Sequence, residues 1–461
     1  MTRENKTRSI FGRAGAAIVL LVWLLPGEPA RGQDEALHAI WQRVLGNNPQ
    51  LQSARAQVEI AGMQLAFQQR ERFPKLTSGA SYAYVSEIPE LQIPIPFPGV
   101  APFSLKAGTY NRYDFSATVQ QPIFTGWRLR NQARAAQSGM LARRAEYRAR
   151  RNGLLLQAGT LYYQILLRQL QEQVVDQAVA RADLHLQRAR SLFRAAQATA
   201  FDTLEVANRK LRLLNSKRQL ENARRILEAR LRRLVGGKDL PEMPTAVEDQ
   251  KIDQTLPPLD SLLQRAQLFR PELQALQAKI EMDNAKSRVA RSLYFPQIYG
   301  SATYHYARPG VNFFRDEWMT YYTVGIGLKW DLWNWGQRHL QVQQAELSRR
   351  ASELQQMDMK NQVEEQVKEA YYRLLTLRDQ IDLQQRLVDQ ERERYRLTRI
   401  RYKQSQATSL DLSDAEKSLY SAELTQKQYW VQWQTAWLQL QFATGTIGRS
   451  SGLMDESHEQ R

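Results

Sequence analysis

Residues 73–84 have the sequence FPKLTSGASYAY, and residues 295–306 have the sequence FPQIYGSATYHY. Both segments begin with Phe-Pro and end with alternating tyrosines, and they lie 222 residues apart. The same offset separates Asn48-Pro49-Gln50-Leu51 from Arg270-Pro271-Glu272-Leu273. A fixed offset over much of a chain indicates an internal duplication, which sets the architecture before any single motif is considered.

The second half of each copy keeps a different offset. Tyr162-Tyr163 matches Tyr371-Tyr372, and Gln197-Ala198-Thr199 matches Gln406-Ala407-Thr408, in both cases 209 residues apart. The first copy therefore carries 13 extra residues. Most of them fall in residues 87–108, which are rich in proline and apolar residues and which we expect to form an extended surface loop.

The first 32 residues have the features of a secretory signal peptide. A basic start precedes an apolar run from Ala14 to Leu25, and Ala30-Arg31-Gly32 fits a small-x-small cleavage site. The run is too short to span a bilayer as a helix, although an anchored or buried N-terminal helix is the alternative. The chain has no cysteine, which excludes disulfides, thiolate metal sites and an N-terminal lipid-bearing cysteine.

The chain of 461 residues is strongly basic, with a formal net charge of +17. Such a charge suggests nucleic acid or an acidic membrane surface as a partner. Export from the cytoplasm argues against nucleic acid. No apolar run of 18 or more residues follows the signal, so we expect no membrane-spanning helix.

Hydrophobic periodicity and breaker residues predict the same elements in both copies, in a fold that is mainly α-helical. An opening helix comes first in each copy, at 35–72 and 259–293. Repeat 1, residues 33–236, has strands at about 76–86 and 111–124, a long helix at about 126–196 and a return helix at about 202–235. Repeat 2, residues 259–445, has strands at about 297–307 and 319–332, a long helix at about 336–404 and a return helix at about 411–443. An inter-repeat linker covers 237–258, and a flexible C-terminal tail covers 446–461.

The predicted strands alternate cleanly between apolar and polar residues. Tyr113, Phe115 and Val119 alternate with Arg112 and Asp114, as expected for a half-buried strand. Strands of about ten residues with aromatic ends are typical of a membrane β-barrel, and a soluble sheet packed on the helices is the alternative. Four strands cannot close a barrel, and a membrane tolerates no open sheet edge, so a membrane barrel would require several chains.

Each long helix would extend ~105 Å at 1.5 Å per residue. Apolar side chains recur every seven residues along the second one, which predicts coiled-coil packing: Val367, Leu374, Ile381, Val388, Tyr395 and Tyr402. Glu172 interrupts the matching stripe of the first long helix, and it requires either a solvated position or a partner. The opening and return helices are each about half as long, so both can pack alongside one long helix.

From about residue 34 to 445 the chain resembles the TolC-like outer-membrane efflux factors. The resemblance rests on Asn48-Pro49, the two Phe-Pro corners, the strand-to-helix junctions at 121–126 and 330–336, and the paired hairpin tips. It implies a homotrimer in which each chain gives four strands to one twelve-stranded barrel. A long α-helical coiled-coil tunnel continues the barrel. The resemblance also implies outer-membrane lipid, a periplasmic adaptor and an inner-membrane transporter as partners.

The second hairpin tip carries the candidate entrance residues. By resemblance, Asp411 and Asp414 would ring the periplasmic entrance, and their i, i+3 spacing puts them on one helix face. Six carboxylates around a narrow opening would repel anions and bind cations. The alternative for Asp411, and likewise for Asp202 in the first tip, is an N-terminal capping box with the preceding threonine.

Other tip residues carry further expectations from the resemblance. Tyr402 and Asp202 are expected to form a contact that latches the tips. The chain departs from the family because Ala196 and Ser405 replace tip glycines, and Ala407 replaces a latch arginine. Four basic residues are candidate adaptor contacts, or alternatively favourable charges at helix C-termini: Arg190, Arg194, Arg399 and Arg401.

These observations predict a passive exit duct in the outer membrane of a Gram-negative bacterium. It would serve a tripartite efflux or type I secretion system. A periplasmic coiled-coil scaffold or adaptor without a pore is the alternative. The five histidines are scattered without ligand spacing, and no phosphate-binding glycine loop is present. We therefore expect no catalytic residues, no enzymatic activity, no cofactor and no metal site.

Overall fold

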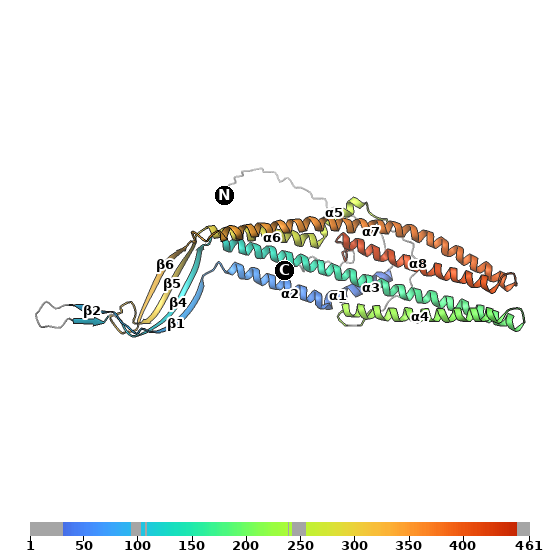
Figure 1. Ribbon diagram of the computed structural model, residues 1–461, viewed down its shortest axis with the longest axis horizontal. Helices are drawn as coiled ribbons and strands as arrows, with labels where there is room; N and C mark the ends of the chain where they lie inside the picture. The colour runs from blue at the N-terminus through green and yellow to red at the C-terminus, as the bar shows by residue number, and fades with distance from the viewer. Residues whose placement is uncertain (1–30, 94–102, 107, 238, 242–254, 450–461) are drawn as a thin grey trace, which may run out of the picture.

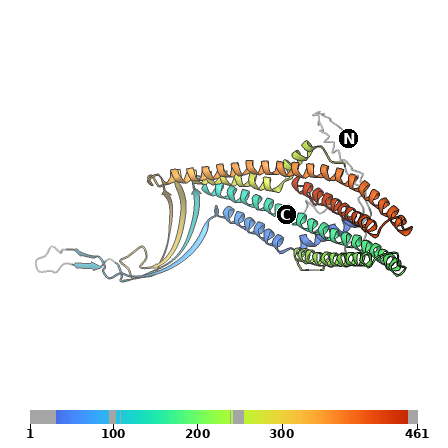
Figure 2. The same ribbon diagram turned by 45° about the vertical axis from the view of Figure 1, so that its right-hand side comes forward.

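The computed structural model describes residues 31–93, 103–106, 108–237, 239–241 and 255–449. All but the last two residues of the predicted signal peptide, most of the linker and most of the C-terminal tail lie outside these residues. The described part is a long helical body with a sheet at one end (Figures 1 and 2). None of its helices is both long and apolar enough to span a membrane.

Four strands form one antiparallel sheet in the order β1-β4-β5-β6. They are β1 (Lys75–Tyr84), β4 (Asn111–Phe124), β5 (Gln297–Arg308) and β6 (Met319–Lys329). The predicted surface loop at 87–108 is only partly irregular, because β2 (Glu90–Ile93) pairs with β3 (Phe103–Lys106). The pairing extends the first hairpin beyond the main sheet (Figure 1).

The register gives this sheet two chemically different faces. Val119 pairs with Ala302, which pairs with Val324, so apolar residues line one face. Thr118 pairs with Thr303 on the opposite face, and their hydroxyl oxygens lie 3.0 Å apart. Because strand side chains alternate, both faces continue along all four strands. The apolar face is uncovered along β6, where Tyr322, Val324, Ile326 and Leu328 are all exposed.

The helical body follows the order of the sheet. It comprises α1 (Arg31–Asn47), α2 (Pro49–Arg70), α3 (Arg128–Arg194), α4 (Ala200–Leu234), α5 (Leu259–Phe269), α6 (Pro271–Arg291), α7 (Gln337–Lys403) and α8 (Ser409–Ala443), with a short 3-10 turn η1 (Ser292–Tyr294) after α6. Next to the sheet, α2, α3, α6 and α7 lie side by side in that sequence. Towards the other end, α4 packs on α3 and α8 packs on α7.

Each opening helix, predicted as continuous, is broken in the structure. The first breaks at Asn48, whose extended backbone suits the residue before a proline. The Asn48 Oδ1 accepts hydrogen bonds from the Gln50 and Leu51 amides, and its Nδ2 donates to the Leu234 carbonyl. In repeat 2, Arg270 takes this place, and its Nη1 donates to the Phe442 carbonyl. Both breaks therefore fasten an opening helix to the end of a return helix.

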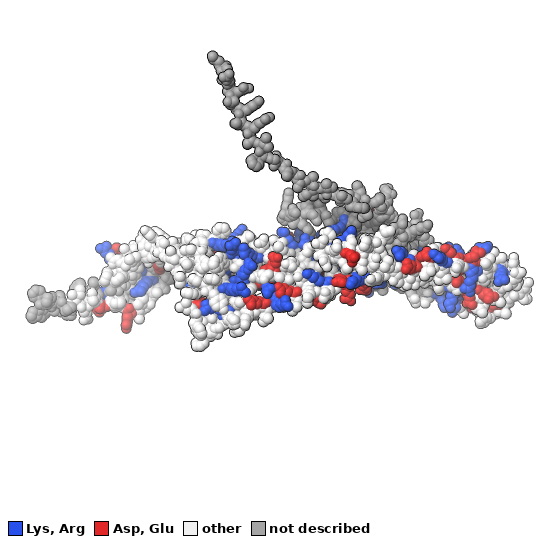
Figure 3. All heavy atoms as spheres, turned by 90° about the horizontal axis from the view of Figure 1, so that it is seen from above, with Lys and Arg blue, Asp and Glu red and all other residues white. Residues whose placement is uncertain are grey.

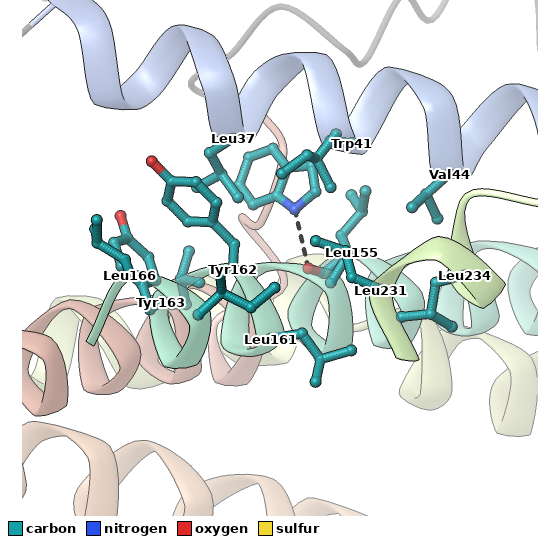
Figure 4. Packing of buried hydrophobic residues seen from close by; sticks show 14 of the residues in the cluster. Leu37, Trp41, Val44, Leu155, Leu161, Tyr162, Tyr163, Leu166, Leu231 and Leu234 are labelled. Atoms are coloured by element: carbon teal, nitrogen blue, oxygen red, sulfur yellow. Dashed lines mark hydrogen bonds between the residues drawn. The ribbon is translucent and has the colours of Figure 1, made fainter. Parts of the chain in front are cut away.

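The largest apolar core lies where α1 packs against α3 and the end of α4 (Figure 4). Trp41 contributes its ring to this core, and its Nε1 donates to the Leu155 carbonyl at 2.9 Å. Tyr162, from the duplicated Tyr-Tyr pair, is fully buried. Ile447 is also fully buried, although the sequence places it in a flexible tail.

The predicted heptad packing is confirmed. Val367, Leu374 and Val388 have no exposed surface. Glu172, the polar residue in the first stripe, has a partner, because the Arg224 Nε of α4 donates to its Oε1 at 3.0 Å. The long helices pack against their return helices through these stripes.

Candidate functional site at the hairpin tips

The α3–α4 and α7–α8 hairpins end in equivalent turns at the far end from the sheet (Figure 1). Ala196 and Ser405 have φ values of 56° and 59°, in the left-handed region that glycine favours. The following amides, of Gln197 and Gln406, donate to the Leu192 and Arg401 carbonyls at 2.8 Å. This is the Schellman arrangement, which satisfies carbonyls at the helix ends. The turn geometry therefore persists without the tip glycines.

Asp202 and Asp411 occupy the same position in the two tips. Each carboxylate accepts hydrogen bonds from the amide and hydroxyl of the preceding threonine, Thr199 or Thr408, and so forms a capping box. These hydrogen bonds hold the pKa of Asp411 below its ordinary value. The capping alternative is thus the role that the structure gives to both residues.

Asp414 differs from Asp411. It is exposed on α8 one turn further on, and its side chain makes no ion pair or hydrogen bond with any described residue. Asp414 is therefore the aspartate of the pair whose carboxylate has no partner among the described residues.

Tyr402 is buried between the two hairpins rather than exposed at the tip. It packs with Leu192 and Leu412, and its ring meets the His185 ring edge-on at 5.2 Å. Burial is the main cause that raises the pKa of Tyr402; a hydrogen bond with Ser409 opposes it and the Asp202 charge adds to it. The expected Tyr402–Asp202 hydrogen bond is not among the contacts of the described residues. Tyr402 contributes mainly by packing.

The four basic candidates, Arg190, Arg194, Arg399 and Arg401, are all exposed near the tips. The Arg399 guanidinium lies 5.7 Å from the centroid of the Tyr395 ring. Neighbouring basic residues of α7 are paired with acids three residues away. On the face drawn in Figure 3, acidic and basic side chains mix at this end of the body. The surface of the tips is therefore less uniformly basic than these four arginines alone would suggest.

A buried polar cluster lies two turns inside the tips, and the sequence analysis missed it. We define it as His185 of α3, Arg209 of α4, and Ser409 and Glu416 of α8. The side chains of His185 and Glu416 are each only 1% exposed. The Glu416 Oε2 lies 3.3 Å from the Arg209 Nη1 and 3.6 Å from the His185 Nδ1. The His185 Nε2 lies 3.1 Å from the Ser409 hydroxyl.

This cluster joins three helices of the two hairpins, but some of its buried polar atoms lack a hydrogen-bond partner among the described residues. Neither carboxylate oxygen of Glu416 has a hydrogen-bond partner among the described residues. Burial lowers the pKa of Arg209, and the Glu416 charge opposes that effect. A sequence signal existed, because Glu416 and Glu423 lie seven residues apart in the apolar stripe of α8. The second acid also pairs across hairpins, with Arg181 at 2.8 Å.

No set of three or more His, Cys, Asp or Glu side chains in the described ranges could hold a metal ion. The tips therefore offer charge, packing and capping.

The chain is similar in fold to solved structures of outer-membrane proteins, two of which are described as channels. The outer-membrane channel OprN is 21% identical, with a TM-score of 0.72 over 90% of each chain. VceC from Vibrio cholerae is 18% identical, with a TM-score of 0.73 over 89% of this chain and 96% of that one. CmeC from Campylobacter jejuni is 16% identical, with a TM-score of 0.74 over 99% of both chains. A search of curated protein sequences found no match.

The family model named "outer membrane efflux protein" matches residues 40–237 and 262–446, which correspond to the two repeats. The chain belongs to the outer membrane efflux protein family. It is an outer-membrane protein and a channel component of efflux systems, and its family is one of transport proteins.

Proposed function

We propose that three copies of the chain form a passive exit duct that runs from the periplasm to the exterior. The observation that carries this proposal is the shared order of the two layers, β1-β4-β5-β6 and α2-α3-α6-α7. Among the described residues, each layer ends in elements that have only one neighbour within that layer. Because open strand edges are not tolerated in lipid, β1 and β6 require partners, and other copies of this chain can provide them.

Barrel size sets a lower limit on the copy number. Two copies would give eight strands, and side chains fill the interior of barrels that small. Three copies give twelve strands, the smallest multiple of four expected to leave an open lumen. The helical layer would then close into a tunnel of twelve helices beneath the barrel.

Exposed apolar side chains support the contact between copies. Leu340 and Leu347, seven residues apart on α7, are 63% and 69% exposed. On α2, at the other edge of the layer, Met63 and Phe67 are 71% and 60% exposed. Seven-residue spacing suits coiled-coil packing of α7 against α2 of the next copy.

The apolar face of the sheet argues against the pore-free scaffold. Tyr322, Val324 and Ile326 of β6 are each more than 70% exposed. A soluble scaffold would place this face in water, whereas a barrel places it against lipid. The polar face, with Thr118 and Thr303, would then line the lumen.

At the tips, we propose that Asp414 lines the periplasmic entrance and that Asp411 adds charge while capping α8. Tyr402 and Asp202 would keep the entrance closed by packing and capping rather than by a direct hydrogen bond. Exposed Arg190, Arg194, Arg399 and Arg401 would contact a periplasmic adaptor. An inner-membrane transporter, of the efflux or type I secretion kind, would supply energy and select the cargo.

The experiment is reconstitution of the purified protein in planar bilayers, with its mass measured in the same detergent. We expect a mass of three chains and cation-preferring channels, because acidic side chains line the entrance. Asp414→Ala should reduce the cation preference, with Lys417→Ala on the same helix as the control. A monomer without conductance would overturn the duct, and unchanged selectivity in Asp414→Ala would overturn the entrance assignment alone.

A further inference from the structure

A basic recess lies where the helical body joins the sheet, at the opposite end from the tips. It has a volume of about 350 Å³ and lies between the first turns of α3 and the end of α6. Arg130 and Arg134 line it from α3, and Arg288 and Arg291 line it from α6. No acidic residue is among its lining side chains. Four guanidinium groups therefore share one small space.

Most of this positive charge is uncompensated by the protein. The Arg291 Nη2 donates to the Glu346 Oε1 at 2.6 Å. The other three arginines, Arg130, Arg134 and Arg288, are exposed, and their side chains form no ion pair or hydrogen bond with any described residue. Trp127, the N-cap of α3, provides no side-chain cap, so the positive end of the helix dipole also faces this region. Like charges held together in this way favour an anion as occupant.

Aromatic contacts connect the recess to the apolar face of the sheet. Phe124 pairs with Ile298 of β5. Ile298 lies four residues before Ala302 on the same strand, so both side chains point to the apolar face. The Phe124 ring meets the Trp127 ring edge-on at 5.3 Å, and Trp127 meets Phe295 at 5.2 Å. Trp127 and Phe295 line the recess themselves. The recess therefore follows directly after the surface that we assign to lipid.

The backbone at this junction is tightly fixed. Gly126 has a φ of 60°, and a Cβ atom there would lie 2.7 Å from the Ser292 carbonyl oxygen and 2.8 Å from the Phe295 Cβ. This close approach holds the start of α3 against the end of α6. Both helices are inner members of their layer, so a neighbouring copy would not cover the space between them.

We propose that this recess binds the phosphate of an anionic phospholipid in the periplasmic leaflet of the outer membrane. Guanidinium groups bind phosphate oxygens with two parallel hydrogen bonds, and basic pockets at the ends of membrane segments bind lipid headgroups. Tryptophan favours the same interfacial depth, so Trp127 would lie beside the headgroup. On the face drawn in Figure 3, basic side chains gather over the part of the helical body next to the sheet. The lipid would fix the depth of the protein in the membrane.

This proposal rests on insertion of the sheet into the membrane, as proposed above. Its test measures bound lipid by native mass spectrometry on full-length protein in an uncharged detergent. Phosphatidylglycerol and phosphatidylcholine are added in separate samples, and a third sample receives phosphatidylglycerol together with excess inorganic phosphate. The pocket variant combines Arg130→Gln, Arg134→Gln and Arg288→Gln. The control combines Arg230→Gln, Arg232→Gln and Arg233→Gln, which neutralise three exposed arginines of α4.

We expect wild type and control to prefer phosphatidylglycerol, and the pocket variant to bind it at least about tenfold more weakly. A variant with lysine at all three positions should recover part of the binding, which separates charge from a folding defect. Equal binding by wild type and pocket variant, equal binding of phosphatidylcholine, or full displacement by inorganic phosphate would each overturn the proposal. Mass and conductance of the same samples test the duct separately, so failure of either proposal is recognised by itself.

Discussion

Asn48 and Arg270 show how one structural task is performed by different chemistry in the two repeats. Each residue is buried at the break of an opening helix, and each side chain donates to a carbonyl near the end of a return helix. Asn48 also caps the helix that follows it. Arg270 instead pairs with Glu272 at 3.0 Å and lies over the Phe442 ring at 4.7 Å. The duplicated position therefore retained its connection while its residue changed.

The buried polar cluster gives a prediction at the same scale. Glu416→Ala leaves Arg209 and His185 without their carboxylate, and removing one partner of a buried ion pair costs ~3–5 kcal/mol. The free energy of unfolding, measured with denaturant, should fall by about this amount. The control is Asp414→Ala on the same helix, which should stay within ~0.5 kcal/mol of wild type because Asp414 is exposed. Equal stability of both variants would contradict a structural role for Glu416.

Tyr402 gives a prediction about pH. Its pKa is raised mainly by burial, so the folded tip binds its proton more tightly than the unfolded chain does. The stabilisation is complete below the ordinary pKa of ~10 and is lost as pH rises through the raised pKa. Subtracting the ultraviolet titration of Tyr402→Phe from that of wild type should give a midpoint above 10. A midpoint at or below ~10 would show that the side chain is not buried.

At the scale of elements, α3 and α7 have the same length, 67 residues each, although their sequences differ in most positions. Each of these two helices begins and ends next to a residue with left-handed backbone conformation. Left-handed residues precede the helix, at Trp127 and Gly336, and follow it, at Ala196 and Ser405. The strand junction and the tip therefore determine the length of the body, and the seven-residue stripe between them aligns each long helix with its neighbours.

A substitution at Gly445 tests the contact between the end of α8 and the end of α5. Gly445 has a φ of 71°, and a Cβ atom there would lie 2.6 Å from the Phe269 carbonyl. Gly237 has a φ of 80° with no atom near its Cβ position, so it is a matched control for backbone strain alone. Gly237→Ala should cost ~1–2 kcal/mol, and Gly445→Ala should cost more, measured by thermal unfolding. Equal costs would mean that the helix ends do not touch as described.

Much of the helical structure was predictable from the sequence, because capping residues and hydrophobic spacing within each helix determine it. The threonine–aspartate pairs predicted the caps and the heptad stripes predicted the long helices, and both are present. The breaks at Asn48 and Arg270 were missed, because both lie within an otherwise continuous helical pattern. The pairing of β2 with β3 was obscured by prolines between them. The buried polar cluster depends on how two hairpins pack, which no single helix pattern contains.

At the scale of the whole molecule, both layers of the described part of the protomer stop at elements that have only one neighbour within the layer. The sheet ends at β1 and β6, and the helical layer ends at α2 and α7. The tips carry the entrance candidates, and the opposite end of the helical body carries the basic recess. A closed ring of copies would complete both layers at once, whereas an isolated chain would leave them open.

Cysteine cross-linking between β1 and β6 tests this closure most directly, because the natural chain has no cysteine. Ser81→Cys is combined in turn with Tyr321→Cys, Thr323→Cys or Gly325→Cys, which share the polar face and cover three registers. Val324→Cys, on the apolar face, is the control. Oxidation in membranes should link exactly three chains in at least one same-face pair and none in the control. Chains that stay single in every pair, or products larger than three chains, would contradict the closed trimer.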